Sequence, residues 1–152
     1  MKDFHLLFAR SLSENERWNN GLIDLLGDEG DLPSSVGGAY VIGTAATMLT
    51  YPWGTSPIFY IGSSKDLNQR LSMHRKYMLE ARNNWYEYWV SRLQYGAAFG
   101  AHVAWYSKKG LEAPKSLESK LIEAFYFTFG AIPSANAQFP DKVRPKREDE
   151  NE

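Results

Sequence analysis

Two basic side chains lie one turn apart in a segment that we predict to be a helix over residues 66–80. On a wheel of 100° per residue, Arg70 and His74 fall at the edge of its apolar arc. We therefore expect a guanidinium and an imidazole to be held against the domain, where they can act on a bound group. The alternative is an arginine whose stem packs on the arc while its charged end reaches water.

A carboxylate lies on the apolar face of the last predicted helix, which runs from about Pro114 to Phe129. On the wheel, Glu118 falls between Phe125 and Phe129. A carboxylate in such surroundings must be paired or must ligate something. The sequence leaves two alternatives, a bound metal or a buried salt bridge with an arginine such as Arg70.

A strand and a glycine turn precede the first of these helices. Residues 58–61 are apolar and β-prone, and Gly62 permits a close approach that a side chain would block. Ser63 or Ser64 is the expected helix cap, and an acidic residue in the first turn, Asp66, suits the helix dipole.

Two further segments are predicted strands, residues 37–43 and residues 99–106, the first because it is a short apolar run bounded by glycine. Residues 50–57 are rich in Pro and Gly and indicate a loop. We expect the strands on either side of this loop to be antiparallel neighbours, which would bring Tyr40 close to Tyr60.

A second, strongly aromatic helix is expected after Asn83 and Asn84, with its end at Gly96. We expect Trp85 and Trp89 to be core residues rather than platforms on which nucleic-acid bases stack. The arginines and lysine around it, including Arg92, are equally well explained by a solvated helix face or by contact with a nucleic-acid backbone.

Three regions follow from composition. Residues 1–36 indicate an N-terminal helical extension, with capping boxes at Ser11 and Ser13, an apolar run of helical spacing from Trp18 to Leu26 and an end at Gly27. Residues 37–140 form the predicted domain. Residues 141–152 are highly charged and indicate a disordered tail.

The 152-residue chain contains no cysteine, which excludes thiolate chemistry and disulfides. It has no apolar run of membrane-spanning length and no signal-peptide pattern, so we expect a cytoplasmic protein without membrane contact. Residues 37–140 hold ten basic and six acidic residues, a local excess of +4 that is compatible with a phosphate-bearing partner.

Several of these residues, in this order, resemble the GIY-YIG nuclease superfamily. The segment from Tyr60 to Arg70, Tyr-Ile-Gly-Ser-Ser-Lys-Asp-Leu-Asn-Gln-Arg, carries the most specific part of the resemblance, which covers about residues 37–138. The other matching elements are Gly38-Ala39-Tyr40, His74, Glu118 and Asn136. The chain departs from the family in having Ala39 in its first tripeptide, a longer loop between the tripeptides and no second histidine near Asn83.

The resemblance implies an α+β fold with a three-stranded antiparallel sheet flanked by helices. It implies a DNA endonuclease that hydrolyses phosphodiester bonds with Mg²⁺, or with Mn²⁺ in its place. By position, Glu118 resembles the metal-ligating carboxylate and Arg70 the arginine on the scissile phosphate. Tyr40 and Tyr60 resemble the active-site tyrosines, and Asn136 the residue that closes the site.

The chemistry of these residue types suits such roles. Arginine holds a phosphate bidentately, and a cation on one carboxylate can neutralise the leaving alkoxide. The water-activating base is Tyr40, Tyr60 or His74, and the sequence leaves the three open. We also expect substrate contacts from residues near the turn and on the helix, namely Gly62, Ser63, Lys65 and Arg75.

Two other functions remain open at this stage. One is a non-catalytic nucleic-acid-binding or protein-interaction module on the same fold. The other is a catalytic domain that depends on a targeting protein or on a homodimer, since the chain has little room for a separate DNA-reading domain.

Overall fold

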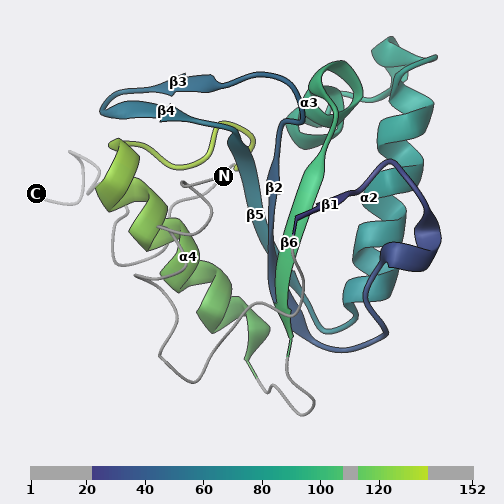
Figure 1. Cartoon of the computed structure of the whole chain (residues 1–152), viewed down its shortest axis with the longest axis horizontal. Coiled ribbons are helices and arrows are strands. Elements are labelled where there is room, and N and C mark those ends of the chain that lie inside the picture. The colour runs from purple at the N-terminus through teal and green to yellow at the C-terminus, as the bar shows by residue number, and fades with distance from the viewer. Residues whose placement is uncertain (1–21, 108–112, 137–152) are drawn as a thin grey trace, which may run out of the picture.

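The computed structural model describes residues 22–107 and 113–136, and this part of the chain has an α+β fold (Figure 1). The expected start of the N-terminal helix and the tail over residues 141–152 lie outside the described residues. The strands are β1 (Ile23–Asp24), β2 (Gly38–Gly43), β3 (Leu49–Tyr51), β4 (Gly54–Ser56), β5 (Ile58–Ser64) and β6 (His102–Ser107). The helices are α2 (Leu67–Ala81), α3 (Ser91–Phe99) and α4 (Pro114–Phe129), and two short 3₁₀ turns are η1 (Glu29–Asp31) and η2 (Trp85–Glu87).

The main sheet is antiparallel and has four strands in the described residues, in the order β1-β6-β2-β5. The predicted antiparallel pairing of β2 with β5 is confirmed, with Tyr40 opposite Gly62 and Val41 opposite Ile61. The expected number of three strands is wrong, because β1 adds a fourth at the β6 edge. Strand β5, which carries Tyr60, Ile61 and Gly62, lies at the opposite edge of the sheet.

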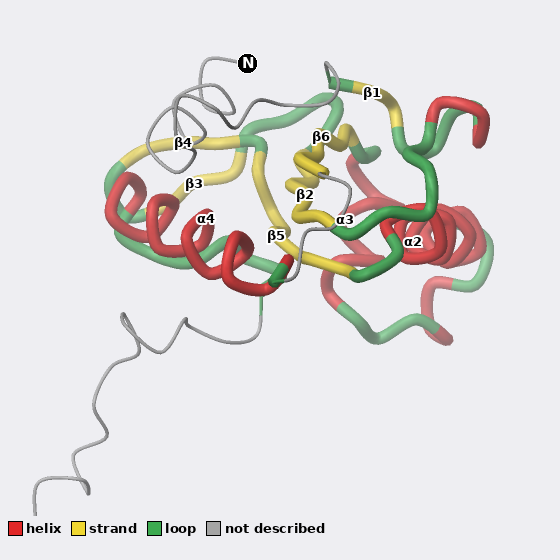
Figure 2. The backbone as a smooth tube through the Cα atoms, turned by 90° about the horizontal axis from the view of Figure 1, so that it is seen from below, coloured by secondary structure: helices red, strands yellow, loops and turns green. Residues whose placement is uncertain are grey.

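The sheet separates two apolar clusters, one on each face. Figure 2 shows the sheet between α4 on one side and α2 on the other, with β5 at its edge. Val41 and Ile61 pack toward α4, whereas Tyr40 and Ile42 pack toward α2 and α3. Because side chains alternate along a strand, β2 contributes to both clusters and is buried along its whole length.

Residues 22–26 do not form the predicted helix. Ile23 and Asp24 pair with β6, and the backbone N–H of Leu25 donates to the carbonyl of Ala101 at 2.9 Å. Leu22 packs on the α4 face, while Ile23 and Leu25 pack on the other. The free edge of β6 offers hydrogen bonds and apolar surface on both faces, and these tertiary contacts outweigh a helix propensity already weakened by Gly21 and Gly27.

The segment expected to be a loop between β2 and β5 contains a hairpin, β3 with β4. Tyr51 in this hairpin is buried, donates its hydroxyl to the carbonyl of Ile58 at 2.6 Å and stacks edge-on against Phe125 of α4 at 5.0 Å. The hairpin therefore extends the core beyond the sheet, which a reading of Pro and Gly content alone misses.

Helix α2 forms as predicted, but its N-cap is Asp66 rather than Ser63 or Ser64. The Asp66 side chain accepts a hydrogen bond from the N–H of Gln69 at 3.0 Å. Ser64 instead closes the turn by bonding the backbone of Asp66. A carboxylate at this position satisfies a free N–H and also suits the helix dipole.

The predicted aromatic helix is wrong in both its ends. A short turn, η2, precedes α3, which begins at Ser91, and the helix continues through Gly96 to Gly100, whose φ of 76° ends it. Gly96 is needed where α3 crosses α2, because a Cβ there would overlap the side chain of Met78. The expected burial of Trp85 and Trp89 is also wrong, since they are 49% and 85% exposed.

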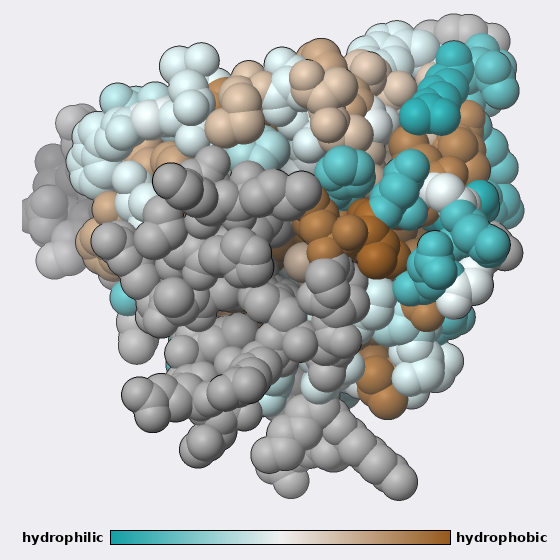
Figure 3. Space-filling model, viewed as in Figure 1, coloured by the Kyte–Doolittle hydropathy of each residue, from teal (hydrophilic) through white to brown (hydrophobic). Residues whose placement is uncertain are grey.

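Helix α4 has the predicted bounds and the predicted apolar stripe. Leu121, Phe125 and Phe129 are buried against the sheet, and Gly130 ends the helix with a φ of 79°. Figure 3 shows hydrophilic residues gathered over the side of the molecule where α2 lies, with hydrophobic residues exposed between them. No helix in the described ranges is long and apolar enough to cross a membrane.

Candidate active site

Tyr40 of β2 and His74 of α2 form a buried polar pair. The Tyr40 hydroxyl and His74 Nε2 share a hydrogen bond of 2.8 Å, and the two side chains are 1% and 3% exposed. The prediction that His74 faces the domain is confirmed. The pair lies within an otherwise apolar cluster between the sheet and α2, where a polar group is stable only when hydrogen-bonded.

Gly62 makes room for Tyr40. A Cβ at Gly62 would lie 2.5 Å from both Cζ and the hydroxyl oxygen of Tyr40, which faces it across the strand pair. Any side chain at Gly62 would therefore push the ring away from His74. The requirement for glycine in this turn is one of close approach rather than of unusual backbone torsion.

Tyr60 of β5 joins the pair and stands closer to solvent. Its ring centroid lies 6.1 Å from that of Tyr40 and 5.8 Å from that of His74, and its side chain is only partly buried. The predicted proximity of the two tyrosines is confirmed. Of the three aromatic side chains, Tyr60 is the one that a substrate can reach.

Arg92 of α3, which the sequence left open between a solvated helix face and a nucleic-acid contact, lies in the site. Its guanidinium lies over the ring of Tyr60 at 5.3 Å from the centroid, and its buried Nε has no hydrogen-bond partner within residues 22–107 and 113–136. The wheel could not place this residue because the helix was predicted to start just after Asn83 and Asn84, six or seven residues before α3 begins at Ser91. An arginine next to a predicted aromatic cluster was the only available signal.

Arg70 lies at the mouth of the site and is exposed, more than its predicted position against the domain implied. Its positive charge nevertheless acts on Tyr40, His74 and Glu118, since it favours the charged forms of the two acids and opposes protonation of the histidine. The charge of Arg70 therefore acts on groups on both faces of the sheet at the β5 edge, namely the Tyr40–His74 pair on one face and Glu118 on the other.

Glu118 approaches β5 from α4, on the face of the sheet opposite to Tyr40. Ser63 donates its hydroxyl to Glu118 Oε2 at 3.1 Å, and this is the one hydrogen bond of Glu118 within residues 22–107 and 113–136. The carboxylate is half-buried. Its bonded partner is thus a hydroxyl rather than the guanidinium of Arg70, which argues against the buried salt bridge considered from the sequence.

Asn136 pairs with the open edge of β5. Its Oδ1 accepts from the N–H of Ile61 at 2.9 Å, and its Nδ2 donates to the carbonyl of Ile61 at 2.8 Å. The N–H of Ala135 also bonds the carbonyl of Phe59 at 2.8 Å. The side-chain amide of Asn136 therefore takes the place of a neighbouring strand at Ile61 and holds β5 beside the site.

The predicted substrate contacts at Gly62, Ser63, Lys65 and Arg75 divide into two groups. Gly62 and Ser63 lie in the site, and Lys65 is exposed in the turn just after it. Arg75 points elsewhere, because its guanidinium donates to the carbonyl of Gly27 at 2.7 and 3.0 Å and so secures the loop after β1.

Burial controls the acid–base character of the site. Desolvation, followed by the neighbouring Tyr60, raises the pKa of Tyr40 well above its usual 10.0. Desolvation, followed by the charges of Arg92 and Arg70, lowers the pKa of His74 to about 3. Desolvation also raises the pKa of Glu118, against the opposing effects of Ser63, Lys115 and Arg70. His74 is therefore neutral at physiological pH and acts as a hydrogen-bonding partner, not as a cation.

The site offers one carboxylate to a metal. Within the described part of the chain, no group of three or more acidic, histidine or cysteine side chains could hold an ion. Mg²⁺ prefers oxygen ligands and commonly keeps several waters beside one or two carboxylates and a phosphate. Glu118, half-buried and bonded through only one of its oxygens, fits such an ion but not one that requires several protein ligands.

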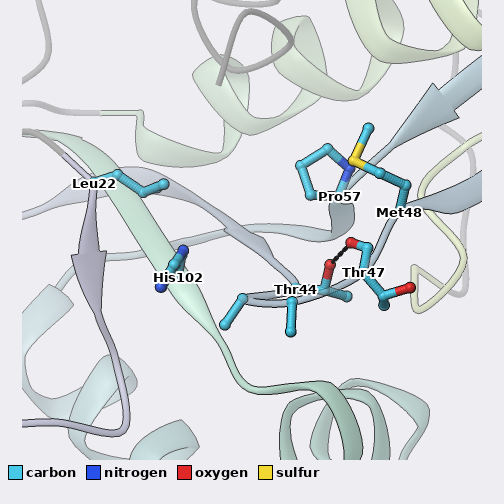
Figure 4. Close-up of a pocket in the computed structure, with 8 residues that line it drawn as sticks. Leu22, Thr44, Thr47, Met48, Pro57 and His102 are labelled. Carbon is cyan, nitrogen blue, oxygen red and sulfur yellow. Dashed lines mark hydrogen bonds between the residues drawn. The ribbon is translucent and has the colours of Figure 1, made fainter.

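A separate cavity of about 520 Å³ opens at the far end of β2 (Figure 4). It is lined by Leu22, Thr44, Ala45, Ala46, Thr47, Met48, Pro57 and His102. The hydroxyl of Thr44 is bonded to the carbonyl of Thr47, and none of the predicted site residues lines this cavity. His102 is half-buried at its wall.

Comparisons of the chain with protein-family models, with curated proteins and with solved structures gave no match. The assignment to a family therefore stays a prediction from the residues named above.

Proposed function

We propose that this chain is a DNA endonuclease of the GIY-YIG type that hydrolyses phosphodiester bonds with a divalent cation. The observation that carries the proposal is the arrangement around the β5 edge. Tyr60, Arg70 and the Tyr40–His74 pair lie on one side of this edge, and Glu118 is held by Ser63 on the other. Residues from two strands and two helices meet here although 78 positions separate Tyr40 from Glu118 in the chain.

The basic residues suit a phosphodiester. Arg70 is exposed and can offer two parallel N–H donors to the non-bridging oxygens of the phosphate, where negative charge grows during attack. Such donors stabilise the transition state more than the ground state, which is what accelerates the reaction.

Glu118 would hold the cation. When bound, Mg²⁺ supplies charge neutralisation for the leaving oxygen, with water and phosphate as its remaining ligands. The raised pKa of Glu118 and its hydroxyl partner fit a carboxylate that gains stability when a cation arrives. Mn²⁺ has the same ligand preference and should substitute.

Tyr60 is the tyrosine that we assign as general base. It is partly exposed, whereas the hydroxyl of Tyr40 is buried and held by His74. His74 has too low a pKa to take the proton and instead orients Tyr40, which packs beside Tyr60.

Plasmid nicking tests the proposal. Supercoiled DNA is incubated with the purified chain in Mg²⁺, in Mn²⁺ and in EDTA, together with Arg70→Ala as a control that keeps an exposed, non-core position. Nicking that requires the cation and is lost in Arg70→Ala supports the proposal. Binding of DNA without cleavage in either cation would instead support a non-catalytic binding module.

A further inference from the structure

Two tryptophans stand out from the surface between α2 and α3. Trp89 is 85% exposed and Trp85 is 49% exposed, and Val90 next to them is 41% exposed. Clustered large apolar side chains on the surface mark a binding site more often than single ones do. These exposed side chains therefore mark a candidate binding surface for another molecule.

The segment that carries these tryptophans is anchored. The hydroxyl of Tyr88 bonds the carboxylate of Glu80 on α2, and the ring of Tyr88 lies 6.0 Å from that of Tyr77. The N–H of Tyr88 also bonds the carbonyl of Trp85 at 3.3 Å. Trp85 and Trp89 are thus presented from a structured turn, which lowers the entropy lost when they bind.

The tryptophans continue directly into the candidate active site. Arg92 follows Trp89 by three positions, so their Cα atoms lie within about 11 Å of each other. The guanidinium of Arg92 lies over the ring of Tyr60, and among the described residues its buried Nε has no hydrogen-bond partner. A partly buried guanidinium beside the proposed base can bind an anionic ligand, and such a ligand could extend from Arg92 to the tryptophans.

The charge of this region suits a nucleic-acid backbone. Residues 75–92 include four basic residues (Arg75, Lys76, Arg82 and Arg92) and two acidic residues (Glu80 and Glu87). The carboxylate of Glu80 accepts from Tyr88, and Glu87 is exposed within the segment, so the four basic residues leave a local excess of two positive charges. Basic groups that follow a backbone, combined with exposed aromatic rings, are typical of sites for single-stranded nucleic acid.

We propose that the segment from Trp85 to Arg92 binds single-stranded DNA beside the active site. Trp89, assisted by Trp85, stacks on unpaired bases, and Arg92 binds a backbone phosphate next to the one at Arg70. Base faces are covered in a duplex and available only in an unpaired strand. Resting on the proposed function, this inference names the substrate class, which is DNA with unpaired nucleotides next to the cleaved bond.

Binding in EDTA tests the inference without cleavage. Fluorescence anisotropy gives the Kd for a labelled oligothymidylate and for a duplex of the same length, with wild type, Trp89→Ala, Trp89→Phe and Trp53→Ala. Trp53 is the matched control because it is 65% exposed and lies in the β3–β4 turn beside Gly130. Trp89→Ala should raise the Kd for the single strand by about 5- to 100-fold, Trp89→Phe should restore most of the affinity, and Trp53→Ala should change nothing.

The duplex Kd should be the same for all four proteins. Equal single-strand affinities of Trp89→Ala and Trp53→Ala would overturn the inference, as would an equal loss on single strand and duplex. Arg92→Gln should remove about one phosphate contact. The slope of log Kd against log salt for the single strand should then decrease by about 0.7. An unchanged slope would remove Arg92 from the proposed path.

Cleavage assays separate this inference from the proposed function. In Mg²⁺, a flapped duplex should be cut faster than the fully paired duplex by wild type, and Trp89→Ala should lose this preference while still nicking plasmid. If neither DNA is cut, the proposed function fails, yet the anisotropy result still decides the binding site. If both are cut equally by wild type and Trp89→Ala, the nuclease stands and the single-strand site fails.

Discussion

The hydroxyl of Tyr40 and Nε2 of His74 lie 2.8 Å apart in the apolar layer between β2 and α2. Each group satisfies the hydrogen-bonding need of the other, because a buried polar group without a partner lowers the free energy of unfolding. Gly62 completes the arrangement by leaving space for the Tyr40 ring. The pair supports the site from within, and Tyr60 and Arg70 stand toward solvent.

Removal of the Tyr40 hydroxyl should destabilise the protein. Tyr40→Phe leaves His74 buried without its partner, which should lower the free energy of unfolding by about 1–3 kcal/mol. Urea unfolding of Tyr40→Phe, His74→Leu and the double variant measures this coupling, and the double variant should lose less than the sum of the single losses. Strict additivity would mean that the two side chains do not stabilise each other.

Stability should fall in mildly acidic solution because of His74. Its pKa is about 3 in the folded chain, against about 6.5 when unfolded, so below about pH 6.5 the unfolded chain binds a proton that the folded chain does not. The free energy of unfolding should then decrease by up to about 1.4 kcal/mol for each pH unit below that value. Urea titrations between about pH 7 and pH 5 check the slope, which His74→Gln should reduce and His102→Gln should retain. Equal slopes in wild type and His74→Gln would contradict this prediction.

A methyl group at Gly62 should disturb the pair. Gly62→Ala puts a Cβ 2.5 Å from the Tyr40 ring and should lower the free energy of unfolding by about 1–3 kcal/mol, with loss of any nicking activity. Gly54→Ala is the matched control, since its Cβ would meet Phe129 at an ordinary 3.7 Å. Thermal unfolding should show a lower Tm for Gly62→Ala only, and similar Tm values for the two variants would refute the steric argument.

Neutralisation of Glu118 should separate stability from activity. Its pKa is raised by burial, so the folded protein favours the neutral form and ionisation at neutral pH works against folding. Glu118→Gln should therefore be as stable as wild type or more stable, and Ser63 can still donate to the new amide oxygen. Plasmid nicking in Mg²⁺ should be lost while DNA binding is retained. A loss of about 3–5 kcal/mol with activity retained would indicate a buried salt bridge instead of a metal ligand.

The tyrosines should differ in their kinetic roles. Tyr60→Phe keeps the ring but removes the proposed base, so the nicking rate should fall by about 10²-fold or more with little change in Tm. Tyr40→Phe should act mainly through stability. A near-normal rate for Tyr60→Phe, measured as single-turnover cleavage, would move the base to another group, and near-normal rates for both variants and for the double variant would exclude a tyrosine base.

Local pattern in the sequence was enough for the elements that surround the site. The apolar stripes of α2 and α4 determined that His74 and Glu118 face inward, because side-chain direction repeats every 3.6 residues in a helix. Short apolar, β-prone runs indicated β2 and β5, and their succession along the chain on either side of one loop indicated that they pair. The proximity of Tyr40 and Tyr60 followed from that pairing.

Only the tertiary structure decided which segment pairs with the open edge of the sheet and which apolar side chains are buried. Ile23 joins the sheet because β6 has an open edge, and Trp89 is exposed because α3 begins two residues after it, at Ser91. The bond between Tyr40 and His74, the place of Arg92 over Tyr60 and the pairing of Asn136 with Ile61 link residues from separate elements. No local period encodes such contacts, since they arise only when the packed faces compete for the same polar and apolar partners.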